Sequence, residues 1–496
     1  MNKIGFKNFR KFQELPLLDL NPITILVGEN NAGKSTVVKA LLSSLDFFTT
    51  RMSQEDGDSW MNLNFYFNKS YYTHLGTFDR SRYNKAAEGT PITFTVTFRD
   101  IFADRLYEVD VMKSDSEADV YGRVSRVKIT LLPFNIDITF SLRSDRTIKV
   151  IFHAAPYPGY DLSDYQSVLL PKNYNKYFSG LTKDIEMELS FAPEAKLASE
   201  YIADILLHNF FTQLRDIIKN LDSSQKVSDC YSAIGLADDV RQFLSKKKRY
   251  FNGLYFSTNK QTEINVEYIY AHAVTQTVLF SAKDTNDYHV KTIHEFASLQ
   301  IGLGSPAHDF ILKWMDNFKI GINYEVTSVG GEAHLVKIQN KDGEWVNLAD
   351  KGMGSIQLMI LLFRIATKMT EAGIGFGGTN VDTLLIIEEP EQNLHPMLQS
   401  KLADFFFELH KDYGFRFIVE THSEYLIRKS QVIVGAANKD NAEFENPFKV
   451  YYFPSEGDPY DLPYAKSGRF EEQFGSGFFD EATKWNREIL RNENTK

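Results

Sequence analysis

Alternation of apolar and polar side chains predicts strands at the start of the chain. Residues 4–9 alternate apolar and polar positions, as a half-buried strand does. Residues 23–27 form a short apolar run after a proline, which is typical of a buried strand. Apolar residues then recur at helical spacing over residues 36–45. The pattern therefore predicts strand, strand, loop and helix for this segment.

The middle of the chain changes from strands to helices. Residues 51–90 are rich in Asp, Asn, Ser, Tyr and Arg, as in loops. Five alternating segments between residues 92 and 153 predict antiparallel strands joined by short polar turns. Apolar spacing of three and four over residues 193–250 predicts helices. A partner-binding or dimerising helix would give this pattern, and so would an ordinary amphipathic core helix.

The last third alternates helices and strands. A Gly-Gly pair at 330–331 separates two alternating runs, which predicts a hairpin over residues 322–340. Beyond it we expect a helix at 355–370, a strand at 383–387, a helix at 396–410, a strand at 415–420, a helix at 423–430 and a strand at 448–453. Such alternation predicts an α/β fold with a largely parallel sheet flanked by helices.

Composition indicates a globular protein with no membrane span. The chain has 496 residues, of which 43% are hydrophobic and 24% charged, enough for two or three domains with ordinary cores. No run of about 18 apolar residues occurs, and no long apolar stretch follows the basic N-terminus, so neither a membrane span nor a signal peptide is expected. The single cysteine, Cys230, excludes an intramolecular disulfide and a four-Cys zinc site. We expect a cytoplasmic location.

The net charge of −10 argues against a protein whose whole surface binds DNA. A local patch is still open, and the basic run at residues 246–249 is the candidate. A solvated helix end explains that run equally simply, since basic runs are common on surfaces.

Residues 28–35, GENNAGKS, form a complete phosphate loop between a predicted buried strand and a predicted helix start. Glycines allow backbone N–H groups to turn inward around phosphate, the lysine reaches the β- and γ-phosphates, and the serine hydroxyl ligates Mg²⁺. The start of the helix adds partial positive charge. The candidate nucleotide-binding residues are Gly28, Asn30, Asn31, Ala32, Gly33, Lys34, Ser35 and Thr36.

Two adjacent carboxylates, Glu388 and Glu389, follow the predicted strand at 383–387. A carboxylate at such a strand end can hold Mg²⁺ through its waters, and the next can polarise the attacking water. Alone, two glutamates after a strand are weak support for a site. Together with the phosphate loop they indicate that Glu388 is a metal ligand, alongside Ser35, and that Glu389 is the general base.

Two further segments fit a phosphate site. His422 follows the apolar strand at 415–420 and is positioned to contact the γ-phosphate, although a lone histidine at a strand end is often structural. Residues 350–357, DKGMGSIQ, place two glycines and a serine at a helix start, a second surface that can face phosphate. A plain helix cap gives the same pattern.

These four elements, in this order, resemble the ABC-type ATPases of the SMC, RecF and OLD group over residues 1–45 and 320–455. The resemblance makes Gly352, Gly354, Ser355 and Gln357 the signature motif, which contacts the nucleotide of a second protomer. It makes residues 388–396 a fused metal strand and D-loop, with Asn393 and His395 in the D-loop, and it makes His422 the switch histidine. The sequence shows no long heptad pattern, which argues against an SMC-type rod. It shows no acidic cluster after residue 430, so we do not expect an intrinsic OLD-type nuclease.

The resemblance implies an ABC-type ATPase head with a long β-rich and helical insertion between phosphate loop and signature. The implied parts are 1–50 with the phosphate loop, 51–160 as a β-rich lobe, 161–318 as a helical insertion and 319–496 as the rest of the head. The implied cofactors are ATP and Mg²⁺, and the implied partner is a second copy, in a homodimer or higher homo-oligomer.

Two short segments resemble stand-alone bacterial members that act in antiphage modules such as PARIS and Septu. They are residues 72–78, YTHLGTF, and residues 475–480, GSGFFD. This resemblance implies an ATP-dependent sensor or scaffold that controls a separate effector protein, a nuclease or toxin. The alternative is a RecF-like DNA-repair ATPase that binds DNA.

Overall fold

The computed structural model describes residues 2–49, 64–67, 73–99, 104–114, 121–131, 136–144, 147–154, 185–190, 265–269, 278–281, 287–375, 381, 383–441, 443–475 and 478–493. The chain forms two compact units. Unit 1 comprises residues 1–20 and 35–263, and unit 2 comprises residues 21–34 and 264–496. Both units are therefore built from segments far apart in the sequence.

Unit 1 contains an antiparallel sheet whose described strands follow the order β10-β9-β8-β7-β6-β5-β1-β2, with β4 beside β7. Alternation of apolar and polar side chains explains the sheet, since one side of β5 and β6 is buried. The strands are β1 (Lys3–Phe9), β2 (Phe12–Asp19), β4 (Asn64–Tyr66), β5 (Ile92–Arg99), β6 (Asp104–Lys113), β7 (Tyr121–Leu131), β8 (Ile136–Ser144), β9 (Thr147–Ala154) and β10 (Ile185–Ser190).

The five strands predicted between residues 92 and 153 are present as β5 to β9. Strand β2 was not predicted, because its buried residues Phe12, Leu15 and Leu18 fall at every third position, across a register shift against β1, and so do not alternate. Since β2 is the last strand on the described path of this sheet, a proline, which has no N–H, is tolerated there. The helices expected at residues 193–250, and the basic run at 246–249, lie outside the described residues.

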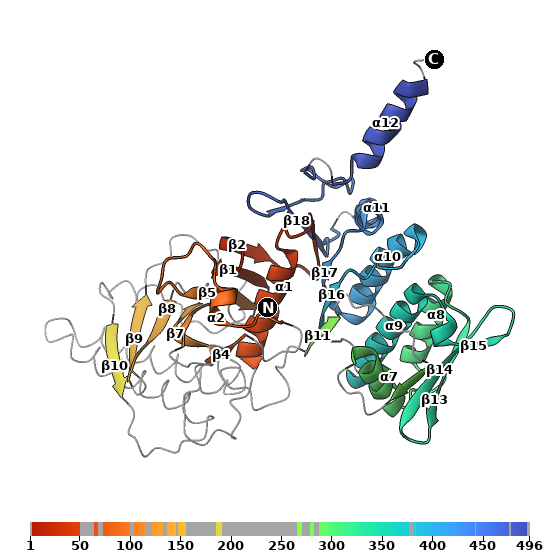
Figure 1. Ribbon diagram of the computed structural model, residues 1–496, viewed down its shortest axis with the longest axis horizontal. Helices are drawn as coiled ribbons and strands as arrows, with labels where there is room; N and C mark the ends of the chain where they lie inside the picture. The colour runs from red at the N-terminus through yellow and green to blue at the C-terminus, as the bar shows by residue number, and fades with distance from the viewer. Residues whose placement is uncertain are drawn as a thin grey trace. The chain divides into compact units, whose positions relative to one another are not determined.

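Unit 2 contains the sheet that carries the predicted phosphate loop, in the order β11-β16-β17-β3-β18-β19 (Figure 1). Its strands are parallel except for the short β19 at the edge. Strands β3 and β16 are buried almost throughout, as expected for a parallel sheet with covered faces. The strands are β11 (Asn265–Ile269), β16 (Thr383–Glu388), β17 (Arg416–Glu420), β3 (Ile23–Gly28), β18 (Phe448–Phe453) and β19 (Tyr460–Asp461). This arrangement confirms the predicted α/β fold class.

The core of unit 2 joins this sheet to helices and to a second, smaller sheet. Helices α7 (Tyr288–Ser298) and α8 (Pro306–Asn317) pack on α9 (Met353–Glu371), and α10 (Pro396–Tyr413) packs on α11 (Glu424–Asp440). The small sheet contains β12 (Leu279–Ser281), β13 (Asn323–Val329), β14 (Ala333–Gln339) and β15 (Trp345–Asn347). Helices α7 and α8 thus belong to the core of unit 2, although they precede the expected boundary at residue 319.

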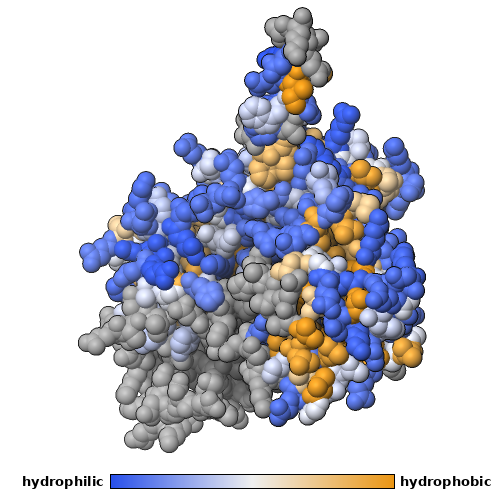
Figure 2. All heavy atoms as spheres, turned by 45° about the vertical axis from the view of Figure 1, so that its right-hand side comes forward, coloured by the Kyte–Doolittle hydropathy of each residue, from blue (hydrophilic) through white to orange (hydrophobic). Residues whose placement is uncertain are grey.

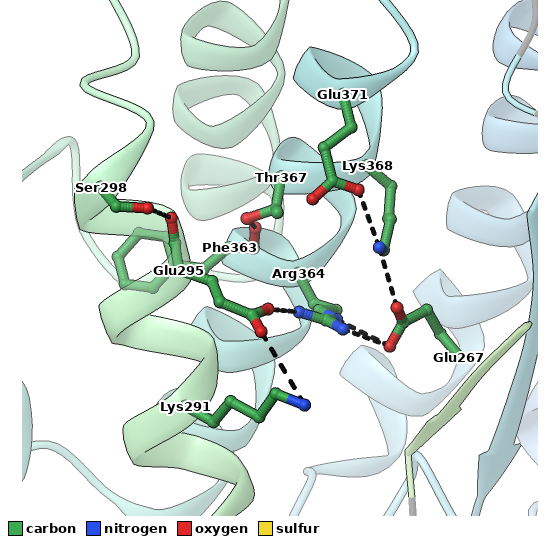
Figure 3. A network of polar contacts seen from close by, with 9 residues as sticks. All are labelled: Glu267, Lys291, Glu295, Ser298, Phe363, Arg364, Thr367, Lys368 and Glu371. Carbon is green, nitrogen blue, oxygen red and sulfur yellow. Dashed lines mark hydrogen bonds and ion pairs between the residues drawn. The ribbon is translucent and has the colours of Figure 1, made fainter. Parts of the chain in front are cut away.

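A buried ion-pair network fastens α9 to its neighbours in unit 2 (Figure 3). The Arg364 guanidinium, 7% exposed, lies between the carboxylates of Glu267 on β11 and Glu295 on α7. One turn further along α9, the Lys368 ammonium lies 2.9 Å from a Glu267 oxygen and 2.8 Å from a Glu371 oxygen. Because β11 pairs with β16, the network connects the middle of α9 to the sheet strand that ends in Glu388.

The electrostatics of this network favour its charged form. Burial alone would raise the pKa of Glu267, but the positive charges of Arg364 and Lys368 and their hydrogen bonds hold it below its ordinary value. Burial likewise opposes the charge of Arg364, and the charge of Glu267 outweighs it and raises the Arg364 pKa. A buried group of this kind is costly to break by removing one partner, since the other charge is then left desolvated.

The surface carries many hydrophilic side chains, with apolar ones gathered in patches between them (Figure 2). Helix α12 (Glu481–Glu493) is the clearest case, with Trp485, Ile489 and Leu490 each more than half exposed. Among the described residues, no helix combines the length and the hydropathy that crossing a bilayer requires.

Replacing Arg364 by Met is expected to lower the free energy of unfolding by up to about 3–5 kcal/mol, because Glu267 then stays buried without its guanidinium partner and Lys368 compensates its charge only in part. Urea unfolding at neutral pH measures this change. Glu371→Gln is the control, since its carboxylate is 45% exposed and should contribute less than about 1 kcal/mol. Equal stability of wild type and Arg364→Met would contradict the role given to the network.

The difference in the free energy of unfolding between wild type and Arg364→Met should shrink in acid. The folded pKa of Glu267 is lowered, so its contribution to stability is complete above the ordinary value of 4.5 and is lost as the pH falls through the folded pKa. Repeating the urea series below that pH measures the loss. A difference that stays constant into strong acid would show that packing, and not charge, accounts for it.

Candidate functional site

The carboxyl ends of four neighbouring strands meet at one edge of the unit 2 sheet. Glu388 at the end of β16 pairs with Glu420 of β17, and Glu420 pairs with Leu26 of β3. On the other side of β3, Gly28 pairs with Phe453 of β18. Segments separated by more than 350 residues in the sequence are therefore adjacent here. In open α/β sheets this edge is where ligands bind.

Gly28 is required by the close approach of β18. A side-chain Cβ at this position would lie 2.1 Å from the Phe453 carbonyl oxygen, and its φ of +150° is unfavourable for other residues. Farther along the loop, Asn31 (φ 60°) and Gly33 (φ 107°) are also left-handed. These turns carry the chain from β3 into α1 (Lys34–Thr49), with Asn30 and Asn31 exposed and Ala32 buried.

The Lys34 side chain is buried, at 4% exposure, and curls back over its own loop. Its Nζ donates hydrogen bonds to the carbonyl oxygens of Gly28, at 3.1 Å, and Glu29, at 2.9 Å. Burial lowers the pKa of Lys34, while the negative charges of Glu420, Glu389 and Glu391 act to raise it. The ammonium is thus held in the loop by carbonyl groups, which a phosphate could replace as acceptors.

Ser35 and Thr36 occupy the first turn of α1, where backbone N–H groups have no partner within the helix. No acidic residue lies in this turn, so the positive end of the helix dipole is not neutralised locally. Ser35 is half-buried and Thr36 is buried. The helix start can therefore accept an anion next to Lys34.

Glu388 and Glu389 are both half-buried, but only Glu389 has an unusual backbone. Its φ is 44°, a conformation that costs roughly 1–3 kcal/mol for a non-glycine residue. The Glu389 N–H donates to the Glu420 carbonyl at 2.7 Å, and the Gln392 side-chain amide donates to a carboxylate oxygen of Glu389. These contacts fix the direction in which Glu389 leaves the sheet.

Glu391 was given no role by the sequence analysis, yet its carboxylate is buried at 8% exposure. Its Oε1 accepts the backbone N–H of His422 at 2.6 Å, and the Thr421 hydroxyl donates to the same carboxylate. Burial raises the pKa of Glu391, and the charge of Glu389 adds to this effect, while those two hydrogen bonds oppose it. Glu391 thus connects the turn after β16 to the loop after β17.

His422 lies at the start of the loop that leads into α11, and it is half-buried. Burial lowers its pKa, the positive charge of Lys34 lowers it further, and Glu389 acts in the opposite direction. The imidazole is therefore neutral at pH 7 and keeps one N–H to donate. Lys34 and Glu389 therefore lie within electrostatic range of the histidine.

The predicted signature segment lies against the turn that follows β16. A side-chain Cβ at Gly354 would lie 2.6 Å from the Asn393 carbonyl oxygen, so only glycine allows this approach. The Gln357 side-chain amide reaches the Glu389 carbonyl at 3.5 Å, the limit of a hydrogen bond. Gly352 is the exposed N-cap of α9, and the Ser355 N–H donates to its carbonyl at 2.8 Å.

The two predicted D-loop residues are exposed and partly strained. Asn393 has a φ of 58°, and His395 is the N-cap of α10, where its Nδ1 accepts the Met397 N–H at 3.3 Å. A cavity of about 30 Å³, large enough for a water molecule, lies beside Glu388 and Gln357. His289 of α7 also lines this cavity.

The donor set fits a magnesium ion bound together with a nucleotide. Among the described residues, no cluster of three or more His, Cys, Asp or Glu side chains could hold a metal ion by itself. Mg²⁺ in nucleotide sites is usually held by one or two protein oxygens, phosphate oxygens and water. Glu388 of unit 2 is an oxygen donor of that kind, and the hydroxyl of Ser35, the residue that follows Lys34 in the chain, is another.

Comparison with known proteins identifies a family. The family model described as AAA ATPase domain matches residues 1–427. A search of curated proteins gave no match. Similar solved structures include the Smc head domain from Pyrococcus furiosus bound to the C-terminal domain of ScpA, at 9% identity and a TM-score of 0.35, covering 99% of each chain. The SMC head domain from Thermotoga maritima has 10% identity and a TM-score of 0.31, covering 94% of this chain and 98% of that chain. With most of its length matched by the family model, the chain belongs to the AAA ATPase domain family, in agreement with the P-loop ATPase of the ABC type that its motifs predict.

Proposed function

We propose that this protein binds and hydrolyses ATP at the carboxyl edge of the unit 2 sheet, and that hydrolysis switches a homodimer between two states. One observation supports the proposal most: the Lys34 ammonium is buried within the electrostatic range of Glu389, Glu391 and Glu420. A phosphate-binding cation and a group of carboxylates are thereby concentrated where β3, β16 and β17 end.

Each residue has a defined task in this proposal. The β- and γ-phosphates replace the carbonyl oxygens of Gly28 and Glu29 as acceptors for Lys34. Magnesium, held by Ser35 and Glu388, would neutralise phosphate charge and orient the nucleotide. Glu389 accepts a proton from the attacking water, and the Gln392 side-chain amide, which donates to a carboxylate oxygen of Glu389, holds that carboxylate in place.

His422 donates a hydrogen bond to the γ-phosphate in this proposal. Burial and the charge of Lys34 lower the pKa of His422, so an imidazole N–H is the donor offered to the phosphate. The positive charges that face the phosphate are then Lys34, the metal and the start of α1. Removal of the imidazole therefore weakens phosphate orientation while leaving those charges in place.

The signature segment, residues 352–357, would cap the nucleotide of a second copy. Gly352 is exposed at the start of α9, where the free N–H groups of a helix suit an anion, while Gly354 is buried against the Asn393 backbone. Two copies related by a twofold axis would then enclose two nucleotides, each held by the phosphate loop of one chain and the signature of the other. Affinity between the copies exists only while the γ-phosphate is present, which makes hydrolysis a release step.

The resemblance of residues 72–78 and 475–480 to stand-alone antiphage ATPases suggests what the switch controls. We propose a sensor or scaffold that holds a separate nuclease or toxin. The alternative, a RecF-like ATPase acting on DNA, is less favoured because the net charge is −10.

Two inactive variants should restore activity when mixed, if the nucleotide is held between copies. Lys34→Ala lacks the phosphate-binding cation, and Ser355→Arg blocks the signature surface. In heterodimers of the two, one site combines an intact loop with an intact signature. Steady-state phosphate release by an equimolar mixture should approach about a quarter of wild-type activity, since half of the dimers then hold one working site of two. A mixture as inactive as either variant would contradict the shared site.

Replacing Glu389 by Gln should abolish hydrolysis and stabilise the ATP-bound dimer. Gln has the same shape but cannot accept the proton, so kcat should fall by about 100-fold or more while ATP still binds. Light scattering with size exclusion, with and without ATP and Mg²⁺, measures the dimer. Glu408→Gln on α10 is a control, because its carboxylate binds Lys313 and Trp314 and not the phosphate loop. Wild-type hydrolysis by Glu389→Gln would exclude it as the base.

The effector role predicts that the protein co-purifies with the product of a neighbouring gene when the native gene cluster is expressed. Affinity purification and mass spectrometry test this. The DNA role predicts DNA-stimulated ATP hydrolysis that weakens steeply with salt. A chain that purifies alone and hydrolyses ATP faster with DNA would favour the second role over the first.

A further inference from the structure

Glu391 is a buried carboxylate with no cation hydrogen-bonded to it among the described residues. Its Oε1 accepts the His422 N–H, while its Oε2 is buried and has no hydrogen-bond partner in the described part of the chain. Burying a carboxylate in this way is costly. An apolar side chain at this position in the turn after β16 would cost less free energy to bury. The acidic side chain found there therefore indicates a functional role.

The hydrogen bonds that the Glu391 carboxylate accepts lead to one loop. The Thr421 hydroxyl donates to the carboxylate and in turn accepts the Ser423 N–H at 3.0 Å. The Thr421 N–H donates to the Leu26 carbonyl of β3 at 3.0 Å. The loop from Thr421 to Ser423 is thus anchored to β3 on one side and to Glu391 on the other.

This anchoring determines where the His422 side chain can lie. With its own N–H bonded to Glu391 and Thr421 fixed to β3, the backbone of His422 has little freedom. Ser423 then caps α11 by accepting the Leu426 N–H, and it donates to the Gln399 side chain at 2.7 Å. The histidine is therefore held between two fixed neighbours.

We propose that Glu391 is a positioning residue that holds His422 in register with the turn bearing Glu388 and Glu389. This inference rests on the proposed ATP hydrolysis. Glu391 acts through the acceptor oxygen that it offers to the His422 N–H, and it does not contact the nucleotide. A change in the turn after β16 is thereby transmitted directly to the group that faces the γ-phosphate.

Three variants test the proposal in steady-state ATP hydrolysis. Glu391→Ala should lower kcat by about 10- to 100-fold, as removal of a supporting hydrogen bond in an active site typically does. KM should change by less than about threefold, since the phosphate loop is intact. Glu391→Gln keeps an acceptor oxygen for the His422 N–H and should retain most of kcat. Asp342→Ala is the control. The Asp342 carboxylate also accepts a backbone N–H, that of Glu344 at 3.0 Å, but it lies in the turn between β14 and β15. The kcat of this variant should match that of wild type.

A double variant distinguishes positioning from a general structural role. If Glu391 acts through His422, adding Glu391→Ala to His422→Ala should lower kcat by less than about threefold further, because coupled residues are not additive. Losses that multiply fully would overturn the proposal, and so would a Glu391→Gln variant as slow as Glu391→Ala.

Hydrogen exchange provides a readout that does not need activity. The peptide containing His422 should exchange faster in Glu391→Ala than in wild type, and at the wild-type rate in Glu391→Gln. Unchanged exchange in Glu391→Ala would overturn the inference. A wild-type protein that shows the expected exchange but does not hydrolyse ATP would instead refute the proposed function.

Discussion

A buried lysine facing several carboxylates at one edge of a parallel sheet is the constraint on which the rest of the site depends. Lys34 carries one positive charge, while Glu389, Glu391 and Glu420 lie within its electrostatic range. A triphosphate would add further negative charge to this edge, so a divalent cation is needed to balance it. The carboxylates therefore link nucleotide binding to metal binding.

Helix α9 connects this edge to the rest of unit 2 at two points. At its start, Gly354 packs on the Asn393 backbone and Gln357 reaches the Glu389 carbonyl. Two turns later, Arg364 is held by Glu267 on the strand next to β16. A helix fixed at both places cannot shift at its signature end without strain at the turn that bears Glu389. We therefore expect the surface proposed for the second copy to move together with the proposed base.

Much of this architecture could be predicted because it depends on local patterns. Short runs of residues predict the phosphate loop, the strand before the paired glutamates and the strands β5 to β9. Strand β2 was missed because its buried residues fall at every third position, and its place at the end of the sheet path explains why Pro16 is tolerated. The burial of Glu391 could not be predicted from local patterns. It depends on the pairing of β16 with β17, and of β17 with β3, which lies far from both in the sequence. The ion-pair network likewise joins residues almost 100 positions apart.

The most direct test of the central claim is a crystal structure with Mg²⁺ and a non-hydrolysable ATP analogue. The account predicts that the Lys34 Nζ leaves the carbonyl oxygens of Gly28 and Glu29 and lies about 3 Å from β- and γ-phosphate oxygens. It also predicts Glu389 and His422 on the γ-phosphate side of the nucleotide. A Lys34 that keeps its carbonyl partners while the analogue binds elsewhere would contradict the account.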